Sequence, residues 1–598
     1  MSNTPRRLTG YGNLLLAAVS AVWMYTRAES EQLWAYGPLF LYFSLYTGLF
    51  LLATYRADGS VRKRNILSAA SGLLLGFGFP GYVPFPFLLL VALVPLLYLA
   101  KELRAANAPV RTVLAHGFST FVLYNLLATY WVTNTGFFAG LFAVVVNAGL
   151  MCIPWLFYYW TTKRSPSISY LAFATAWLSF EFLHHNWSLN WPWLTLGNGF
   201  MQFPEVVQWY EVTGVFGGSV WILAVNYLAY RVSLALYQPD LALARRRPKY
   251  YLLALVLLPT LGSLIRFWTY TEPAGETVTV AAIQPNFEPH FEKFSRNRDA
   301  QLDTFLDLSE AALAAGPVDY LLYPETSFNN VVEDDPLANG SLLSASEELY
   351  GKGARYLMTG VDGYHIFGPG QSVSPAVRYQ RRSSGDIAYE AINGAVQIDL
   401  ETGNDPQTYR KGVFVPGAES FPFKDVLFFL EPLVNSLGGT VAGRGTQEKR
   451  TPFTSETAAI APVICYESVF GEYFTGYVRE GARAAFVMTN DGWWDNTAGY
   501  RQHLWLSSLR AVETRRAVVR SANVGACAFI DQRGVIQSRT PYDQAGFLRG
   551  EVRLNDAVTL YVRFGDILAR VAVLIFTMIL LTNIARTVRP AAFARDEA

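Results

Sequence analysis

The residues best suited to chemistry lie in the second half of the chain, where the segment APVICYESVFG (461–471) ends an apolar run in Cys465, Tyr466 and Glu467. The apolar start suits a buried strand, and open α/β sheets place their chemistry at the carboxyl ends of strands. Cys465 is therefore either a small core residue, as free cysteines often are, or a nucleophile at a strand end. The segment by itself favours the core residue, so the choice depends on the groups that accompany it.

A cysteine nucleophile needs a neighbour that removes its proton or stabilises the thiolate. Glu325 in LYPETS follows another predicted strand, and Lys411 lies in the Gly- and Pro-flanked loop of YRKGVFVPGAES. Desolvation raises the pKa of a buried glutamate, which could take the thiol proton, and a nearby lysine would favour the thiolate and a tetrahedral oxyanion. His503, the only histidine after Cys465, offers a Cys–His pair as an alternative. Glu325 could instead cap a helix, and Lys411 could be a solvated loop charge.

The composition argues against several other classes of protein. A net charge of +1 leaves no basic excess to meet the phosphates of a nucleic acid. There is no phosphate-binding GxxxxGK(S/T) loop and no HExxH, CxxC or EF-hand pattern, and the histidines are scattered, so neither a nucleotide nor a metal cofactor is expected. Three cysteines are too few for a disulfide framework. Only Cys465 and Cys527 could pair within the polar region, and Cys527 in GACAFI suits a core strand.

The chain also has the composition of a membrane protein. Its residues are 52% hydrophobic and 16% charged, whereas ordinary soluble domains carry about 25% charged residues. About ten segments are long and apolar enough to cross roughly 30 Å of hydrocarbon as helices. They are 12–27, 34–55, 65–80, 84–100, 112–133, 137–160, 168–185, 209–236, 250–269 and 567–585. The first could be a signal peptide, but TRAES is a poor cleavage site, so we expect a retained helix.

Basic residues cluster on every second loop between these segments, from Arg6 and Arg7 at the start to RRRPK (245–249) before the ninth segment. By the positive-inside rule those loops are cytoplasmic, which places the polar region between the ninth and tenth segments outside. We therefore expect two extra N-terminal helices (1–64), a transmembrane helical domain (65–270), an extracytoplasmic domain (271–556), and a C-terminal helix with a cytoplasmic tail (557–598).

The predicted outside segments have two further features. Two stretches rich in loop formers, VVEDDPLANGS (331–341) and VNSLGGTVAGRG (434–445), are candidate mobile loops. The second, with the apolar residues 427–430 before it, is a candidate arm that dips into the membrane. Four tryptophans suit an aromatic belt at the membrane interface, namely Trp187, Trp191, Trp193 and Trp209.

Residues 276–552 alternate short β-type runs with amphipathic stretches, as expected for sheets covered by helices. DAQLDTFLDLSEAALAA (299–315) has apolar residues at helical spacing, and HLWLSSLRAVETRRA (503–517) also suits a helix. Three of the predicted strands end in polar residues, in YPE, ICYE and MTND, and together these ends predict one site. The predicted strands are 277–284, 319–326, 355–362, 393–400, 459–467, 484–491 and 517–523.

These segments together resemble the nitrilase superfamily, whose fold is an αββα sandwich with a Glu–Lys–Cys triad. The resemblance rests on YPET around Glu325, YRK around Lys411 and ICYES around Cys465. NDGWW (490–494), QHL and RAVETRR follow in the order expected for that superfamily. The resemblance implies an α/β sandwich joined to a polytopic helical membrane domain.

The apolar half narrows the resemblance to bacterial apolipoprotein N-acyltransferases. GFGFPGYVPFPFLLLVALVPLLYL (76–99), WPWLTLGNGFMQFPEVVQW (191–209) and GVFGGSVWILAVN (214–226) are similar to that family. IQPNFEPHFEKF and KGVFVPGAESFP match it as well, so the resemblance covers about residues 65 to 590. The two helices expected before residue 65 go beyond the family's usual set.

The resemblance implies a reaction in two steps. The family moves an acyl chain from a phospholipid, usually phosphatidylethanolamine, onto the cysteine as a thioester, and then onto the α-amino group of an S-diacylglyceryl cysteine at the N-terminus of a lipoprotein. By position, Cys465 is the nucleophile, Glu325 the general base and Lys411 the oxyanion stabiliser. The same carry-over gives four supporting or substrate-binding residues, Glu419, Tyr466, Glu467 and Phe294. Near Lys293, where some members have a tryptophan, this chain has Phe291 and Phe294, and we expect an aromatic contact with an acyl chain or head group there.

The resemblance also implies a place and partners for the protein. We expect the inner membrane of a bacterium, with the α/β domain on the periplasmic side. The expected partners are a phospholipid, a diacylated apolipoprotein and the membrane lipids, with no nucleic acid and no cofactor, and the expected state is a monomer. Two other functions stay open: a membrane-tethered amidase that hydrolyses small amides, and an inactive lipoprotein-binding protein. The intact set of Glu325, Lys411 and Cys465 argues against the second, and the apolar helices argue against the first.

Overall fold

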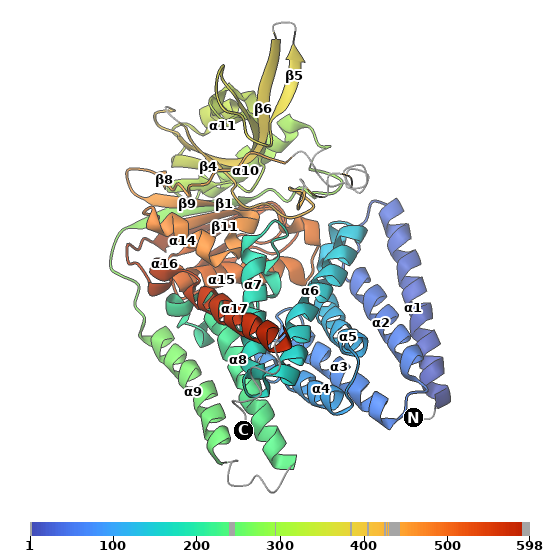
Figure 1. The fold of residues 1–598 in the computed structure, drawn as a ribbon. Helices are drawn as coiled ribbons and strands as arrows, with labels where there is room; N and C mark the ends of the chain where they lie inside the picture. The colour runs from blue at the N-terminus through green and yellow to red at the C-terminus, as the bar shows by residue number, and fades with distance from the viewer. Residues whose placement is uncertain are drawn as a thin grey trace.

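A computed structural model of the chain has a layered α/β half resting on a bundle of long helices (Figure 1). It describes residues 3–237, 246–293, 295–382, 385–403, 406–423, 426, 429 and 443–588. Phe294, the arm proposed at 434–445 up to residue 442, and Leu427, Phe428 and Leu430 before it lie outside the described residues.

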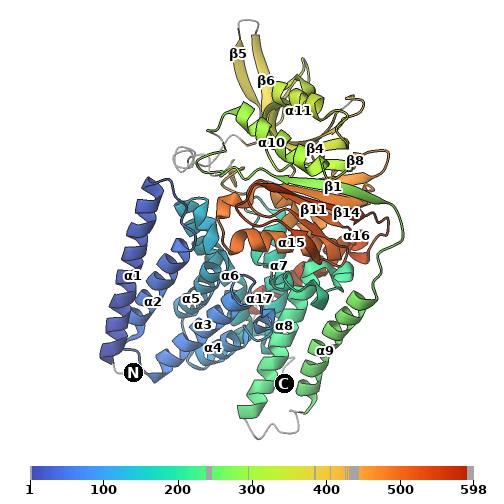
Figure 2. The same cartoon turned by 180° about the vertical axis from the view of Figure 1, so that it is seen from behind.

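All ten apolar segments predicted from the sequence are helical. The helices are α1 (Asn3–Glu29), α2 (Gly37–Thr54), α3 (Gly59–Gly78), η1 (Pro86–Leu90) with α4 (Val94–Ala105), α5 (Val110–Thr129), α6 (Phe137–Arg164), α7 (Ser169–Asn186), α8 (Tyr210–Tyr237), α9 (Arg246–Thr269) and α17 (Ile567–Val588). The start of α1, the C-terminal end of α8 and the N-terminal end of α9 lie on the side away from the α/β half, as the reverse view also shows (Figure 2).

Within the described ranges, seven of these helical segments are long and apolar enough to cross a membrane. The expected number of about ten is therefore too high by these criteria, because α3, α5 and α7 are more polar. Arg62, Lys63 and Arg64 occupy the first turns of α3, and α7 carries Glu181 and a terminal pair of histidines. Helices that pack among other helices need less apolar surface than helices that face lipid.

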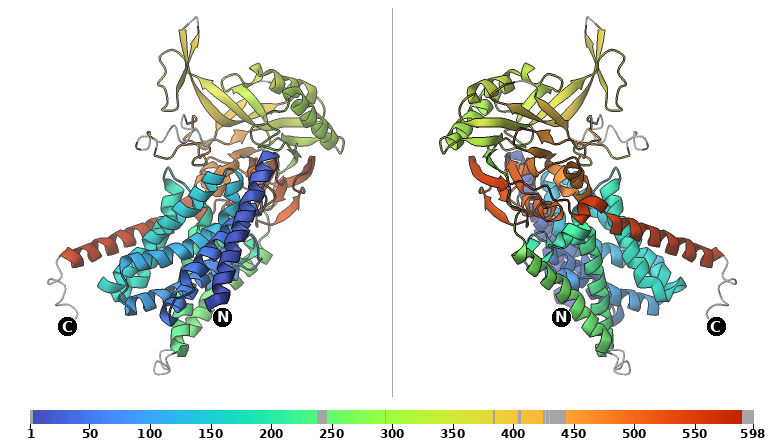
Figure 3. Two further views of the ribbon diagram at one scale, coloured as in Figure 1. Left: turned by 90° about the vertical axis from the view of Figure 1, so that its right-hand side faces the viewer. Right: turned by 90° about the vertical axis from the view of Figure 1, so that its left-hand side faces the viewer.

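The C-terminal helix α17 returns to the helical half after the α/β half is complete. It packs on α6 and α7 through Ile579, which contacts Phe157 and Ala176. Near its end, Asn583 donates to Thr161 Oγ1 at 2.9 Å and accepts from Ser165 Oγ at 3.0 Å. Figure 3 shows α17 leaning out along this flank of the bundle. The helical half thus holds the α/β half by both of its ends, α9 and α17.

The α/β half contains two sheets. The sheet farther from the helical half, called the distal sheet, has eight strands in the order β14-β1-β2-β4-β6-β5, with β3 on β4 and β7 on β6. The sheet nearer the helical half, called the proximal sheet, has six strands in the order β13-β12-β11-β10-β9-β8. The central strands β1, β2 and β4 are parallel, and so are β9, β10 and β11. The distal strands are β1 (Thr277–Gln284), β2 (Val318–Leu322), β3 (Phe328–Val332), β4 (Ala354–Ile366), β5 (Arg378–Arg382), β6 (Gly385–Asp399), β7 (Gln407–Arg410) and β14 (Gly546–Arg553). The proximal strands are β8 (Phe453–Thr454), β9 (Ala459–Ile464), β10 (Ala484–Thr489), β11 (Val518–Ala522), β12 (Ala528–Ile530) and β13 (Ile536–Arg539).

The two sheets face one another across a shared apolar core. Val280 and Leu322 of the distal sheet pack with Val463 and Phe486 of the proximal sheet. The outer face of the distal sheet is covered by α10 (Arg298–Leu313) and α11 (Gly340–Leu349), and that of the proximal sheet by α14 (Gly471–Arg479) and α15 (Ala498–Thr514). This is the αββα sandwich expected from the resemblance, and the predicted helices at 299–315 and 503–517 are α10 and α15.

Helix α15 joins the sandwich to the helical half. Leu504 packs with the sheets, whereas Leu506 and Leu509 pack with the core of the helical half. Gln502 of α15 accepts from Trp131 Nε1 at 3.1 Å and from Trp193 Nε1 at 2.7 Å. Its amide donates to the carbonyls of Pro80 and Ala128. A helix buried on nearly every side must have its polar groups paired, and here these pairs cross between the two halves.

The predicted aromatic belt is wrong for Trp193, which is only 1% exposed. Its ring lies 4.8 Å from that of Trp131 and 5.5 Å from that of Trp494, measured between centroids. Trp131 and Trp494 are also in contact, at 4.9 Å. The tryptophans therefore form part of the interface between the two halves, because the indole N–H has a partner there and the ring has apolar neighbours.

Candidate active site

Cys465 directly follows β9 and opens a 3-10 turn, η10 (Cys465–Val469). Its backbone has φ +46°, in the left-handed region that residues other than glycine rarely adopt and that is enriched at functional sites. The carbonyl of Cys465 accepts from Ser468 Oγ at 2.7 Å and lies 3.2 Å from His503 Nε2. The strand end thus has a special backbone conformation that its surroundings hold in place, as expected for a nucleophile and not for an ordinary core residue.

Glu325 reaches the same place from the distal sheet, three residues after β2. The neighbouring strand β4 has Gly360 beside it, where a Cβ atom would lie 2.6 Å from Glu325 Cα. Gly360 also donates to Pro324 O at 3.2 Å and accepts from Ser327 N at 2.8 Å. The close approach that only glycine permits therefore fixes the turn that carries the carboxylate.

Lys411 follows β7 and is 1% exposed. Its Nζ lies 3.0 Å from Glu325 Oε1 and 2.8 Å and 2.9 Å from the two carboxylate oxygens of Glu419. Asn393 of β6 donates to both carboxylates, at 2.9 Å to Glu325 and 3.1 Å to Glu419. One lysine and one amide thus bind the buried Glu325 and the half-buried Glu419, so Lys411 is no solvated loop charge and Glu325 is no helix cap. The sequence offered no signal for Asn393, which lies in the middle of a long strand.

The electrostatics of the site place the negative charge on the carboxylate. Burial raises the pKa of Cys465 well above its usual range and the Glu325 carboxylate raises it further, while Lys411 opposes both. Burial alone would raise the pKa of Glu325, but Lys411, together with Asn393, brings it below the ordinary value. The raised glutamate pKa expected from the sequence is therefore wrong, because the lysine outweighs desolvation. Burial alone would lower the pKa of Lys411, but Glu325 and Glu419 raise it, so the ammonium is retained. The resting site holds a thiol, a carboxylate and an ammonium group.

Glu467 is fully buried and acts on the backbone around the site. It accepts from Ile464 N at 2.8 Å, at the end of β9, and from Gly412 N at 2.7 Å, beside Lys411. Three tyrosine hydroxyls also donate to it, those of Tyr409, Tyr473 and Tyr477. This one carboxylate ties the strand end that carries the nucleophile to the loop that carries the lysine.

His503 is not placed as the base of a Cys–His pair, because its Nε2 contacts Ser468 Oγ at 3.0 Å and the backbone carbonyl of Cys465 at 3.2 Å. Its other nitrogen lies 2.8 Å from Asp491 Oδ1, and Arg520 Nη2 lies 2.5 Å from Asp491 Oδ2. All three side chains are essentially unexposed. Asp491 belongs to NDGWW and His503 to QHL, so the motifs were recognised while their part in supporting the nucleophile was missed.

Lys293 is a second buried lysine that the sequence did not mark as part of the site. Its Nζ donates to Glu325 O at 3.0 Å and to Thr326 Oγ1 at 2.6 Å. Burial lowers its pKa to about 8, against the opposing effect of Glu325. Thr326 has φ +52°, so Lys293 holds the turn behind Glu325 in an unusual backbone conformation.

Of the remaining predicted residues, Tyr466 is 2% exposed and donates through its hydroxyl to Asn190 O at 3.0 Å, in the segment after α7.

Cys152, Cys465 and Cys527 are all buried and free, so the considered pair between Cys465 and Cys527 does not exist. The candidate mobile stretch 331–341 contains the end of β3, a 3-10 turn and the start of α11.

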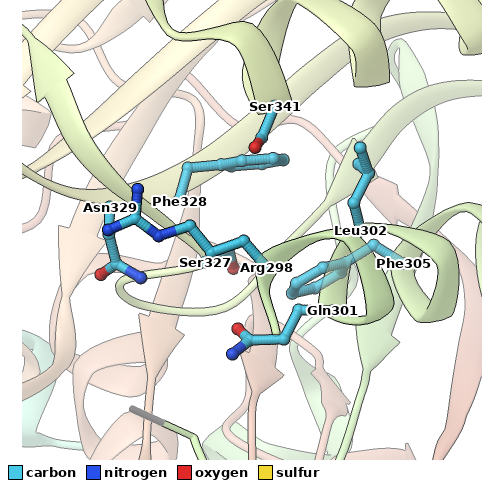
Figure 4. A pocket seen from close by; sticks show the side chains of 8 residues that line it. All are labelled: Arg298, Gln301, Leu302, Phe305, Ser327, Phe328, Asn329 and Ser341. Carbon is cyan, nitrogen blue, oxygen red and sulfur yellow. The ribbon is translucent and has the colours of Figure 1, made fainter. Parts of the chain in front are cut away.

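Neither of two cavities in the described part of the chain is lined by a triad residue. The cavity in Figure 4 has a volume of about 20 Å³ and is lined by residues of α10, β3 and the start of α11, including Ser327 and Phe328. A volume of this size holds about one water molecule, so it is no substrate site. A second, open cavity of about 600 Å³ lies between Tyr270 after α9 and the strands β12 to β14.

One described group of side chains has the makings of a metal site. Glu333, Asp334 and His365 have candidate ligand atoms within 4.8 Å of one another. Glu333 is already paired with Arg410, through contacts of 2.6 Å and 2.5 Å. The neighbouring guanidinium meets the charge that a cation would need, so we assign no metal to this group.

The αββα sandwich, the cysteine at a strand end and the buried glutamate–lysine pair together define a nitrilase-type enzyme. In this chain the enzyme is joined to membrane helices. Comparison with known families agrees: the apolipoprotein N-acyltransferase N-terminal domain matches residues 71–228, and the carbon-nitrogen hydrolase family matches residues 279–560. Among solved structures, the chain resembles Saccharomyces cerevisiae Nit3, a member of the nitrilase superfamily, at 16% identity and a TM-score of 0.34, over 47% of this chain and 92% of that one.

Curated relatives extend the match over both halves. The apolipoprotein N-acyltransferase of Azotobacter vinelandii is 30% identical over 550 residues, which are 88% of this chain and 96% of the relative. That of Chlorobaculum tepidum is 28% identical over 521 residues, covering 85% and 94%. The chain belongs to the apolipoprotein N-acyltransferase family.

Proposed function

We propose that this protein transfers an acyl chain from a membrane phospholipid to the N-terminal amine of a diacylated lipoprotein, with Cys465 as the acyl carrier. The observation that carries the proposal is the contact of 3.0 Å between the buried side chains of Lys411 and Glu325, from which both act electrostatically on Cys465. The family's acceptor is an amine and its donor an ester. A thioester intermediate divides that exchange into two easier steps.

In the first step, Cys465 Sγ attacks the ester carbonyl carbon of the phospholipid while Glu325 takes the thiol proton. Because the resting thiol has a raised pKa, proton transfer accompanies the attack. Lys411 and the backbone N–H of Tyr466 stabilise the oxyanion. When the tetrahedral intermediate collapses, the C–O ester bond breaks and Glu325 returns the proton to the departing alkoxide, which leaves as a lysophospholipid.

In the second step, the neutral α-amine of the lipoprotein attacks the thioester carbonyl. Glu325 takes a proton from the attacking nitrogen, the C–S bond breaks, and the proton goes to the cysteine sulfur. The amide product and the starting thiol result. Since Cys465 is only 9% exposed, little water reaches the thioester, which favours the amine over hydrolysis.

The membrane helices give both substrates access. Acyl chains leave a bilayer at a cost of about 0.8 kcal/mol per CH₂ group, so an enzyme that uses two acylated substrates must meet them at the membrane. We propose a bacterial inner membrane protein with the α/β half on the periplasmic side, in line with the basic residues on the opposite loops. Phosphatidylethanolamine is the proposed donor, and the proposed active form is a monomer. The proposed division is 1–64, 65–270, 271–556 and 557–598.

Intact mass spectrometry of the purified full-length protein after incubation with phosphatidylethanolamine tests the proposal. We expect a gain of one acyl mass that hydroxylamine removes, and none in the Cys465→Ala variant. A diacylated lipopeptide with a free α-amine should then discharge the thioester and gain the acyl chain. A folded wild-type protein that gains no mass would overturn the proposal, and discharge to free fatty acid with no amide product would point to a hydrolase.

A further inference from the structure

The hairpin of α1 and α2 precedes the residues that the N-terminal family model matches, which begin at residue 71. Its turn nevertheless contacts the α/β half. The backbone N–H of Ala35 donates to Asp495 Oδ2 at 3.0 Å, and Ala35 O accepts from Asn134 Nδ2 at 3.1 Å. The next residue, Tyr36, stacks on Tyr130 with ring centroids 5.7 Å apart. In Figure 2 the hairpin stands beside α5 with this turn towards the sandwich.

Asn134 is the centre of these contacts and is 6% exposed. Its side-chain amide donates to Trp494 O at 3.1 Å as well as to the hairpin turn. Its own carbonyl lies 3.1 Å from His290 Nε2. The His290 ring in turn contacts that of Trp493, at 5.1 Å between centroids. One residue of the helical half therefore joins the hairpin to two separate loops of the sandwich.

Those two loops are the ones that support the triad. The loop of Trp493 and Trp494 starts at Asp491, which holds His503 against the carbonyl of Cys465. The loop of His290 leads to Lys293, which donates to the carbonyl of Glu325. A displacement of either loop would move the nucleophile or the base.

The backbone of Asp495 gives a second indication. Its φ of +57° and ψ of −175° lie in a region that is populated almost only by glycine. Such a conformation persists only where the surroundings impose it, and these conformations cluster at functional sites. The two carboxylate oxygens of Asp495 accept from Asn496 N and from Ala35 N of the hairpin.

We propose that the α1–α2 turn, Asn134 and Asp495 form a clasp that positions the two loops behind Cys465 and Glu325. The clasp assigns a role to the N-terminal hairpin: it sets the geometry of acyl transfer without touching substrate. The inference rests on the proposed function. Asn134 and Asp495 are positioning residues, because they act through the loops and not on the reacting atoms.

The test uses the full-length protein in lipid nanodiscs and a matched pair of variants at one position. Asp495→Gly removes the acceptor of the Ala35 N–H and suits the backbone conformation, whereas Asp495→Asn keeps an oxygen acceptor. We expect Asp495→Gly to slow single-turnover acylation about tenfold, since small displacements of reacting groups are costly. Asp495→Asn should acylate at close to the wild-type rate. Both should unfold within about 2 °C of the wild type, because one half-buried hydrogen bond is a small part of the stability of a large protein.

A double variant separates a clasp from unrelated defects. Asn134→Leu removes the donor to both Ala35 and Trp494, and in the Asp495→Gly background it should slow acylation no further, since both changes break one unit. If the Asp495→Gly variant were acylated at the wild-type rate, the clasp would be overturned. The clasp would also be overturned if Asp495→Asn were acylated as slowly as Asp495→Gly and both variants lost thermal stability to a matching extent. Failure of the wild type itself to form an acyl-enzyme would instead overturn the proposed function.

Discussion

The two sheets of the sandwich contribute to the site in different ways. The proximal sheet supplies Cys465, and its covering helix α15 is buried between the sheets and the membrane helices. The distal sheet supplies Glu325 and Lys411, yet its far edge projects away from the helices (Figure 1), where Tyr379 of β5 is 64% exposed. The nucleophile is thus held by packing on the helical half, and the charges come from a sheet whose far edge is exposed. The proximal sheet therefore sets the backbone geometry of the nucleophile, whereas the distal sheet sets the electrostatics of the site.

The largest expected effect comes from the electrostatic side. Lys411→Met removes the ammonium group and leaves the buried Glu325 and the half-buried Glu419 without their cation. We expect acylation to fall about 100- to 1,000-fold and stability by about 3 kcal/mol, measured by single-turnover mass spectrometry and by unfolding in detergent. Glu419→Gln keeps an oxygen acceptor for the lysine and serves as the control, with a smaller loss of rate. Near-normal acylation in Lys411→Met would show that the distal sheet does not supply the oxyanion charge.

The pH dependence should separate the two steps of the reaction. The pKa of Glu325 is lowered and that of Cys465 is raised, so neither group titrates between pH 6 and pH 8 and the acylation rate should stay nearly constant. The attacking α-amine has an ordinary pKa of about 8 and reacts only when neutral, so the transfer rate should rise about 50-fold from pH 6 to pH 8. The test is to measure the rate of acyl-enzyme formation and the rate of acyl transfer to the amine separately at each pH. An acylation rate that falls steeply from pH 8 to pH 6 would contradict the lowered glutamate pKa.

A change in the buried cluster that supports the backbone of Cys465 should cause a smaller loss of activity. Asp491→Asn weakens the support of His503 and leaves the buried Arg520 without its anion. Burial would raise the pKa of Asp491, but Arg520 and His503 lower it to about 2. Because the unfolded value is about 3.9, the charged form stabilises the fold above pH 4, and this contribution is lost as the pH falls through about 2. At pH 7 the variant should lose about 3 kcal/mol of stability and about tenfold in acylation. Unchanged stability would mean that this buried cluster does not hold the nucleophile.

The smallest effect is expected on the exposed surface of the distal sheet. Arg355 and Glu456 form an ion pair at 3.0 Å with the glutamate side chain 72% exposed. Glu456→Gln should change stability by less than about 0.5 kcal/mol and leave acylation unchanged, since exposed pairs contribute little. A clear loss of activity in this variant would show that the rim of the distal sheet is coupled to the site.

Much of the fold followed from local patterns. The strand expected at 277–284 is β1 with the same ends, and the strands expected at 459–467 and 484–491 are β9 and β10, which end two or three residues earlier. Both errors have one cause, because the polar residues counted as the end of the strand belong to the turns that carry the site. Short strands such as β8 and β12 have too few residues for a periodic signal, and sequence patterns did not predict them.

The sequence by itself determined which apolar segments are helical, the alternation of strands and helices, and the identities of the three residues proposed as the triad, because apolar runs and short motifs are local properties. Only the tertiary structure decided how these residues act. Asn393, Lys293 and Asp491 meet the site from distant segments, and no local pattern records which groups become neighbours. The charge state of Glu325 was decided in the same way, since its pKa depends on the balance between burial and the lysine that the fold places 3.0 Å away. The contact of the N-terminal hairpin with Asp495 also joins residues 460 positions apart, which only the packing of the two halves brings together.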